Sequence, residues 1–190
     1  RGMMLHVLIG LLPLAVAGTI VFGWRALLQL GICIAGCLAA ELLLTGIRKR
    51  RATVGDLSAV VTGAILAFSL PATADWYIGL IGAFAAIGFG KFVFGGLGNN
   101  LFNPAMVGRA FVMMAFTQAL AAGGYVDAAS SVDAITRATP LTDFKEAGNV
   151  PSVLALLLGD TNGCVGETSA LACVIGGMYL LWRRAAAWQL

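Results

Sequence analysis

Long apolar runs separated by short polar interruptions make up most of the chain. Met3–Trp24 carries no formal charge and Ala26–Ile47 carries one, so each is long and apolar enough to cross a bilayer as a helix, which takes about 20 residues. Leu57–Leu70 is shorter and stops at Pro71, which predicts a tilted, thin or broken span. The predicted helices are Met3–Trp24, Ala26–Ile47, Leu57–Leu70, Trp76–Phe94, Pro104–Ala122 and Val165–Trp182. The pattern therefore predicts an all-α polytopic membrane protein with six transmembrane helices.

Composition agrees with this class. The chain of 190 residues is 59% hydrophobic and 11% charged, whereas about a quarter of the residues in soluble domains are charged. Its basic residues do not gather on one polar face with aromatic residues, so we expect no nucleic-acid partner. Because the chain begins at Arg1 and stops just after a helix end, we expect residues 1–190 to be a single transmembrane domain that is incomplete on its C-terminal side.

The distribution of charge predicts the topology. Arg48–Arg51 is the densest basic cluster, and the positive-inside rule places it in the cytoplasm. Alternating the predicted helices from there puts both ends of the chain inside and residues 123–163 outside. Other basic residues then fall mainly at inner helix ends and acidic ones mainly outside. Within the outer segment, the apolar run Val150–Leu158 predicts a short helix on or in the membrane surface.

Two stretches interrupt the apolar pattern. Ser131–Thr142 is polar and predicts an exposed loop held by the membrane scaffold, a place where function is often found. Phe94–Pro104 places glycines and asparagines at membrane depth, where irregular backbone is tolerated only if it is buried in protein or lines a cavity. The amides of Asn99, Asn100 and Asn103 are suited to contact a polar ring system. A plain connecting turn, with Pro104 at the first helical position, explains the same residues equally well.

Ionisable residues within or at the ends of apolar spans are functional candidates by default. Glu41 and Lys91 also have a simpler explanation, in which each side chain extends toward the inner surface. Arg109 lies between small residues that leave room for another backbone or an anionic group. Glu167, at the start of the last predicted helix, is equally suited to a structural cap or to a catalytic or ion-binding role. We take Glu41 and Glu167 as candidates for an ion pathway.

The remaining polar side chains do not form a recognisable catalytic or metal-binding set. Cys33 and Cys37 share a helix face, but we interpret them as small lipid-facing or helix-facing residues and expect no metal site. Cys164 and Cys173 show no ligand spacing, and His6 is interpreted as structural. From these residues alone, a channel or transporter explains the chain as well as a redox subunit does.

A specific resemblance separates these classes. Asp133–Leu141, with the sequence Asp-Ala-Ile-Thr-Arg-Ala-Thr-Pro-Leu, resembles the flavinylation motif of a family of respiratory membrane subunits. The family comprises the D subunits of Rnf ferredoxin:NAD oxidoreductases and the B subunits of sodium-pumping NADH:quinone oxidoreductases. Phe94–Phe111 and Gly159–Gly177 resemble the same family, in the same order. The Ala-Thr-Pro-Leu ending favours the Rnf branch.

The resemblance implies that a flavin transferase esterifies Thr139 to the phosphate of FMN, with Asp133, Thr136 and Ala138 as motif residues. Arg137 departs from the motif, which usually has a small residue there. Two alternatives follow for Arg137. Its guanidinium pairs with the FMN phosphate, or its side chain hinders the transferase. The outer loop of residues 123–163 would carry this cofactor.

The family fold is a ten-helix bundle of two related five-helix halves, similar to urea transporters, so about four helices would follow residue 190. Riboflavin is a second, noncovalent cofactor in the family, and we expect its contacts near the break, at Asn99, Asn100, Asn103 and Arg109.

These features predict an electron-carrying subunit of an ion-translocating Rnf-type complex in the cytoplasmic (inner) membrane of a bacterium or archaeon, partnered by other subunits and lipid. The transported ion, Na⁺ or H⁺, stays open. The alternatives are the B subunit of the NADH:quinone enzyme, a solute channel or transporter without flavin, and a purely structural scaffold subunit.

Overall fold

The computed structural model describes residues 2–47, 54–96, 98–117, 120, 144–145, 157, 163–167 and 169–186. Its regular elements are all helical within those ranges. They are α1 (Gly2–Phe22), α2 (Trp24–Ile47), η1 (Val54–Asp56), α3 (Ser58–Phe68), α4 (Trp76–Ala85), η2 (Ala86–Phe92), α5 (Pro104–Ala115) and α8 (Ala170–Trp182).

Each of the six predicted membrane helices has a helical counterpart, with differences at the ends. α1 and α2 are long and apolar enough to cross a membrane, while the other apolar helices are shorter. α5 ends at Ala115, and α8 begins at Ala170 because the Ser169 side chain accepts a hydrogen bond from the backbone N–H of Ala172. The predicted Val150–Leu158 helix lies almost wholly outside the described residues. The ten-helix repeat stays a prediction.

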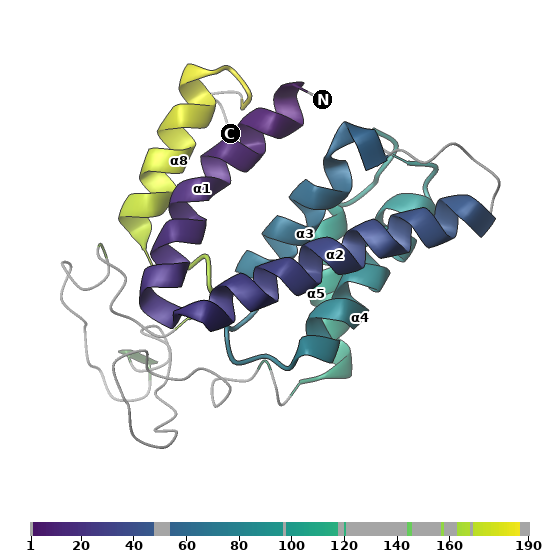
Figure 1. Cartoon of the computed structure of the whole chain (residues 1–190), viewed down its shortest axis with the longest axis horizontal. Helices are drawn as coiled ribbons and strands as arrows, with labels where there is room; N and C mark the ends of the chain where they lie inside the picture. Colours follow the sequence, from purple (N-terminus) through teal and green to yellow (C-terminus); the bar gives the residue numbers. More distant parts are fainter. Residues whose placement is uncertain are drawn as a thin grey trace.

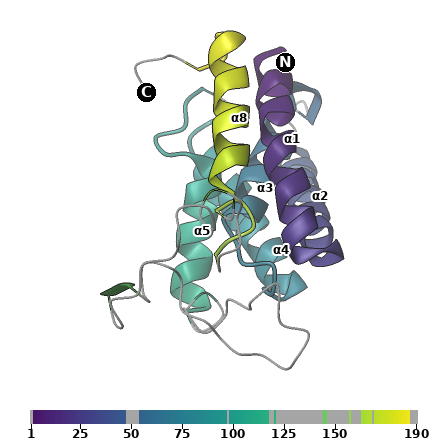
Figure 2. The ribbon, with the colours of Figure 1, turned by 90° about the vertical axis from the view of Figure 1, so that its left-hand side faces the viewer.

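Contacts between helices establish their relative directions. His6 pairs with Tyr179 and Gly10 with Gly176, so α1 and α8 are antiparallel, as both views show (Figures 1 and 2). The same kind of pairing makes α2 parallel to α4 and antiparallel to α3, and makes α4 antiparallel to α5. These directions agree with the alternating topology that the charges predicted.

Small residues allow the helices to approach closely. A Cβ atom built on Gly63 of α3 would lie 2.7 Å from the Cα of Ile34 and 2.8 Å from the carbonyl oxygen of Cys33, both on α2. One built on Gly108 of α5 would lie 2.6 Å from the carbonyl oxygen of Gly82 on α4. Since lipid is as apolar as the side chains, such close backbone packing is what holds membrane helices together.

The short helix α3 ends inside the protein. Its last turn is followed by Leu70, which is 0% exposed. The carbonyl oxygen of Phe68 accepts from Gly166 N–H at 2.9 Å, and that of Leu70 accepts from Val165 N–H at 3.2 Å. The turn before α8 thus satisfies carbonyls that α3 leaves unpaired, which is how non-helical backbone is tolerated at membrane depth.

Candidate functional site

A buried ion pair joins α2 to η2. Nζ of Lys91 lies 2.7 Å from Oε1 of Glu41 and donates a second hydrogen bond, of 2.6 Å, to the hydroxyl of Ser58 at the start of α3. The side chains of Lys91 and Glu41 are 5% and 2% exposed. The simpler explanation, in which both side chains extend to the inner surface, is therefore wrong, because both are buried and pair with each other between helices.

Lys91 of this pair lies in a π-helical segment, η2. Residues Ala86–Phe92 form a π-helix that continues α4, and the wider spacing persists as Val93 N–H donates to the carbonyl of Gly88 and Gly96 N–H to that of Lys91. Such segments are rare and are often found at functional sites. A Cβ on Gly90 would lie 2.6 Å from Pro104 Cα, so η2 also packs closely against the start of α5.

Three buried side chains on α2 lie on the same helix face as Glu41 and precede it in the chain. Gln29, Cys33 and Cys37 precede it at intervals of four residues, so they share its helix face, and all are buried against the bundle. The Sγ of Cys37 lies 3.9 Å from the carbonyl oxygen of Ala83 on α4. The interpretation of these cysteines as helix-facing is confirmed, and the described residues contain no group of three metal-binding side chains.

The polar break before α5 is built around glycines with positive φ. Gly95, Gly96 and Gly98 have φ values of 101°, 112° and 92°, which side chains rarely adopt. Asn103 caps α5, since its Oδ1 accepts from Ala105 N–H at 3.1 Å. The predicted helix start at Pro104 is confirmed.

One amide in the break has an unpaired oxygen. Oδ1 of Asn100 is buried and has no hydrogen-bond partner among the described residues. The same break contributes Phe102 to a groove of about 400 Å³, which is also lined by Phe89 and Phe111, whose rings stack with centroids 6.0 Å apart. A buried acceptor and an aromatic surface are each compatible with contacts to a flat, polar-edged ring.

A second ion pair lies halfway along α5. Nη1 of Arg109 is 3.7 Å from Oε1 of Glu167, and its Nη2 is 3.9 Å from Sγ of Cys164. Oε2 of Glu167 accepts from Cys164 N–H at 3.4 Å. Arg109 thus contacts the turn before α8, while the three asparagines belong to the break that precedes α5.

The alternative in which Glu167 caps the last helix is wrong. α8 begins at Ala170, and Ser169 is the residue whose side chain caps it. Glu167 lies in the preceding turn, where Arg109 and the Cys164 N–H hold its carboxylate. A serine directly before an apolar run is an N-cap signal, so the sequence held the information needed to find Ser169.

His6 links α1 to α8, as a structural histidine is expected to do. Its Nδ1 lies 3.0 Å from the hydroxyl of Tyr179 and its Nε2 3.2 Å from Nη2 of Arg183. Because the guanidinium can only donate, Nε2 accepts, and in the neutral ring Nδ1 donates to Tyr179. No signal in the sequence indicated this pairing, which joins opposite ends of the chain.

The predicted flavin-attachment motif lies outside the described residues. This applies to Asp133, Thr136, Arg137, Ala138 and Thr139, whose proposed roles depend on sequence alone. In the chain this segment comes after α5, which ends at Ala115.

Comparison with known proteins identifies relatives of the whole chain. The profile of the NQR2, RnfD, RnfE family matches residues 1–190. The D subunit of the Na⁺-translocating ferredoxin:NAD⁺ oxidoreductase complex of Acetobacterium woodii is 44% identical over 192 residues, covering 98% of this chain and 59% of the relative. The D subunit of the proton-translocating complex of Clostridium ljungdahlii is 36% identical, with the same coverage. The D subunit of an ion-translocating oxidoreductase complex of Halorhodospira halophila is 37% identical, covering 99% of this chain and 62% of the relative. The chain thus spans about three fifths of the length of these relatives.

Proposed function

The chain belongs to the NQR2, RnfD, RnfE family, and from this premise we propose that it is an electron-carrying membrane subunit of an ion-translocating ferredoxin:NAD oxidoreductase. The main support is the family match over residues 1–190, which includes the motif ending at Thr139. The three relatives are all D subunits of ion-translocating oxidoreductase complexes, which favours this branch over the B subunit of an NADH:quinone oxidoreductase.

Thr139 is the proposed attachment point of FMN. A flavin transferase would join the threonine oxygen to the FMN phosphorus of a pyrophosphate donor such as FAD, while the pyrophosphate P–O bond breaks, AMP leaves and the hydroxyl proton passes to a base. A segment outside the membrane is accessible to that enzyme. Arg137 places a guanidinium two residues away, suited to the phosphate. The flavin supplies the electron-transfer chemistry when bound, while the protein supplies attachment, orientation and electrostatics.

A noncovalent flavin, riboflavin, is proposed at the break between η2 and α5. The buried Oδ1 of Asn100 would accept a hydrogen bond from the ring edge, and the stacked Phe89 and Phe111 offer an apolar wall. Asn99 adds a polar group beside Gly95. Arg109, halfway along α5, contacts Glu167 and Cys164 and stays a proposed contact of this flavin.

Glu41 and Glu167 remain the proposed carboxylates of an ion pathway. Glu41 is buried in the bundle but faces the Lys91 ammonium, so a cation would have to compete with an internal positive charge. Glu167 is more accessible, with a side chain that is 56% exposed. Coupling of ion movement to electron transfer would involve the other subunits, with the whole complex in the cytoplasmic membrane.

In-gel fluorescence tests the proposed attachment. The full-length subunit is expressed with a flavin transferase, denatured, separated on a gel and illuminated. We expect a fluorescent band that is lost in Thr139→Ala and kept in the matched control Thr142→Ala, which removes a hydroxyl three positions away. A dark wild-type band would favour a solute channel or transporter. Unchanged electron transfer by the complex carrying Thr139→Ala would favour a structural scaffold.

A further inference from the structure

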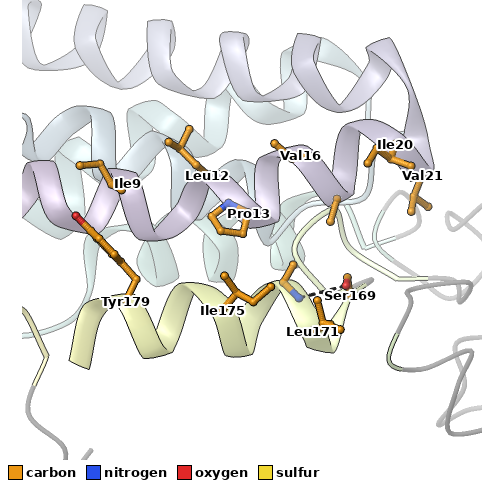
Figure 3. Close-up of a pocket in the computed structure, with 12 residues that line it drawn as sticks. Ile9, Leu12, Pro13, Val16, Ile20, Val21, Ser169, Leu171, Ile175 and Tyr179 are labelled. Atoms are coloured by element: carbon orange, nitrogen blue, oxygen red, sulfur yellow. Dashed lines mark hydrogen bonds between the residues drawn. The ribbon is translucent and has the colours of Figure 1, made fainter. Parts of the chain in front are cut away.

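An apolar groove runs between α1 and α8 on the outside of the bundle (Figure 3). It encloses about 610 Å³. α1 and α8 pack closely at Gly10 and Gly176, which follow the groove residues Ile9 and Ile175 in the chain, and a Cβ on Gly176 would collide with the backbone of Gly10. Its walls are apolar side chains, with Ser169 at one end and Tyr179 at the other. The wall residues of α1 include Ile9, Leu12, Val16 and Ile20, and those of α8 include Leu171 and Ile175.

The groove opens outward. Leu12, Val16 and Ile20 are 57%, 56% and 78% exposed, so their side chains face whatever surrounds the bundle. From Ile9 to Val21 the groove follows α1 for roughly 18 Å at 1.5 Å per residue. That length exceeds one leaflet of hydrocarbon, which is about 15 Å thick. An extended acyl chain therefore has room to lie along it.

A basic, hydrogen-bonding cluster closes one end of this groove. Tyr179 lines the groove and pairs with His6, which in turn accepts from Arg183. Arg184 follows with φ 53°, at the turn that ends α8. Trp182 is 78% exposed at the same level, as is typical of a residue at the membrane surface.

The Arg183 guanidinium has no carboxylate partner among the described residues, where the two ion pairs involve Lys91 and Arg109. Charge complementarity therefore calls for an external anion beside the mouth of the groove. Basic pockets between transmembrane helices on the cytoplasmic side are suited to anionic lipid headgroups.

We propose that the α1–α8 groove binds an anionic phospholipid, with its phosphate at Arg183 and His6 and one acyl chain along the groove. Another helix would fill the apolar walls but would leave the basic end without a counter-charge. A zwitterionic lipid would fill the groove but would gain less from Arg183.

Photo-crosslinking in vesicles tests the proposal with a defined probe. The full-length subunit is reconstituted with phosphatidylglycerol carrying a diazirine in its acyl chain, or with phosphatidylcholine carrying the same chain. Labelled peptides from α1 and α8 are then quantified by mass spectrometry. We expect phosphatidylglycerol to label these helices more than phosphatidylcholine does. Arg183→Gln should lower the preference roughly fivefold, the factor expected for one basic residue at an anionic surface.

Variants separate the site from general lipid contact. Arg183→Lys keeps the charge and should keep the preference, whereas Ala17→Phe fills the groove and should reduce labelling with the basic end intact. Arg25→Gln removes an exposed arginine from the first turn of α2 and should change nothing. Equal labelling by both lipids, or no effect of Arg183→Gln, would overturn the proposal. The absence of lipid labelling, with protein covering the groove, would also overturn it.

Discussion

Nζ of Lys91 lies 2.7 Å from Oε1 of Glu41, with both side chains buried in the bundle. The pair connects the π-helical η2 to α2, and Ser58 of α3 accepts the second hydrogen bond from the ammonium. An isolated charge at this depth would be costly. Pairing leaves the site neutral, so the two residues are best understood as one unit whose members cannot be changed independently.

Breaking this unit should therefore be more damaging than removing it. Glu41→Gln removes the ion-pair partner of a buried ammonium, and Lys91→Met removes the ion-pair partner of a buried carboxylate. We expect each to lower the free energy of unfolding by roughly 3–5 kcal/mol. The double variant should lose less than the sum of the single losses. Denaturant unfolding in detergent measures all three. Strictly additive losses would show that the two side chains do not interact.

Close packing of α3 on α2 gives a second prediction. Gly63→Ala would place a methyl group 2.7 Å from Ile34 Cα, and we expect a loss of about 1–3 kcal/mol from overpacking. Gly46→Ala on α2 is the matched control, because a Cβ there meets nothing within 4 Å. It should be neutral or stabilise by up to about 1 kcal/mol. Thermal unfolding of both variants tests this prediction. Equal losses of stability would argue against close packing of α3 on α2 at Gly63.

The asparagines of the break should separate into two roles. Asn103→Ala removes the cap of α5 and should lower stability by about 1 kcal/mol, while Asn103→Ser keeps a capping oxygen and should restore it. Asn100→Ala should instead reduce the amount of noncovalent flavin that copurifies with the subunit. Flavin released by acid precipitation measures this content. Full flavin content in Asn100→Ala would contradict the proposed contact.

Glu167 allows structure and function to be told apart. Its pair with Arg109 spans 3.7 Å and is partly exposed, so Glu167→Gln should change stability by at most about 1 kcal/mol. If Glu167 lies on the ion pathway, the same variant will raise the ion concentration needed for half-maximal electron transfer by the assembled complex. An unchanged ion dependence in a stable variant would remove Glu167 from the pathway.

Much of the fold followed from the sequence because lipid imposes a simple rule. Every apolar run of sufficient length became a helix, and the charges predicted alternating directions that the contacts between helices reproduce. Helix ends were less accurate where a local hydrogen bond decides them, as Ser169 does for α8. The sequence pattern also revealed that α3 is short, but not that the turn before α8 would pair with its final carbonyls.

The ion pairs were harder to predict because they join residues far apart in the chain. Glu41 and Lys91 are separated by 50 positions, and extension of each side chain toward the inner surface offered a simpler explanation. Their pairing depends on the parallel packing of α2 and α4 and on the wider turn of η2. For Thr139 the sequence supplies a role that the structure does not describe, since the proposed role comes from resemblance alone and the residue lies outside the described residues.

Peptide mass spectrometry gives the decisive test of FMN attachment. Trypsin cleaves after Arg137 and Lys145, releasing a peptide of residues 138–145 that contains both Thr139 and Thr142. In protein isolated from cells with the flavin transferase, we predict that this peptide carries one FMN as a phosphoester and that its fragments place the group on Thr139. An unmodified peptide, or a flavin on Thr142, would contradict the proposed function.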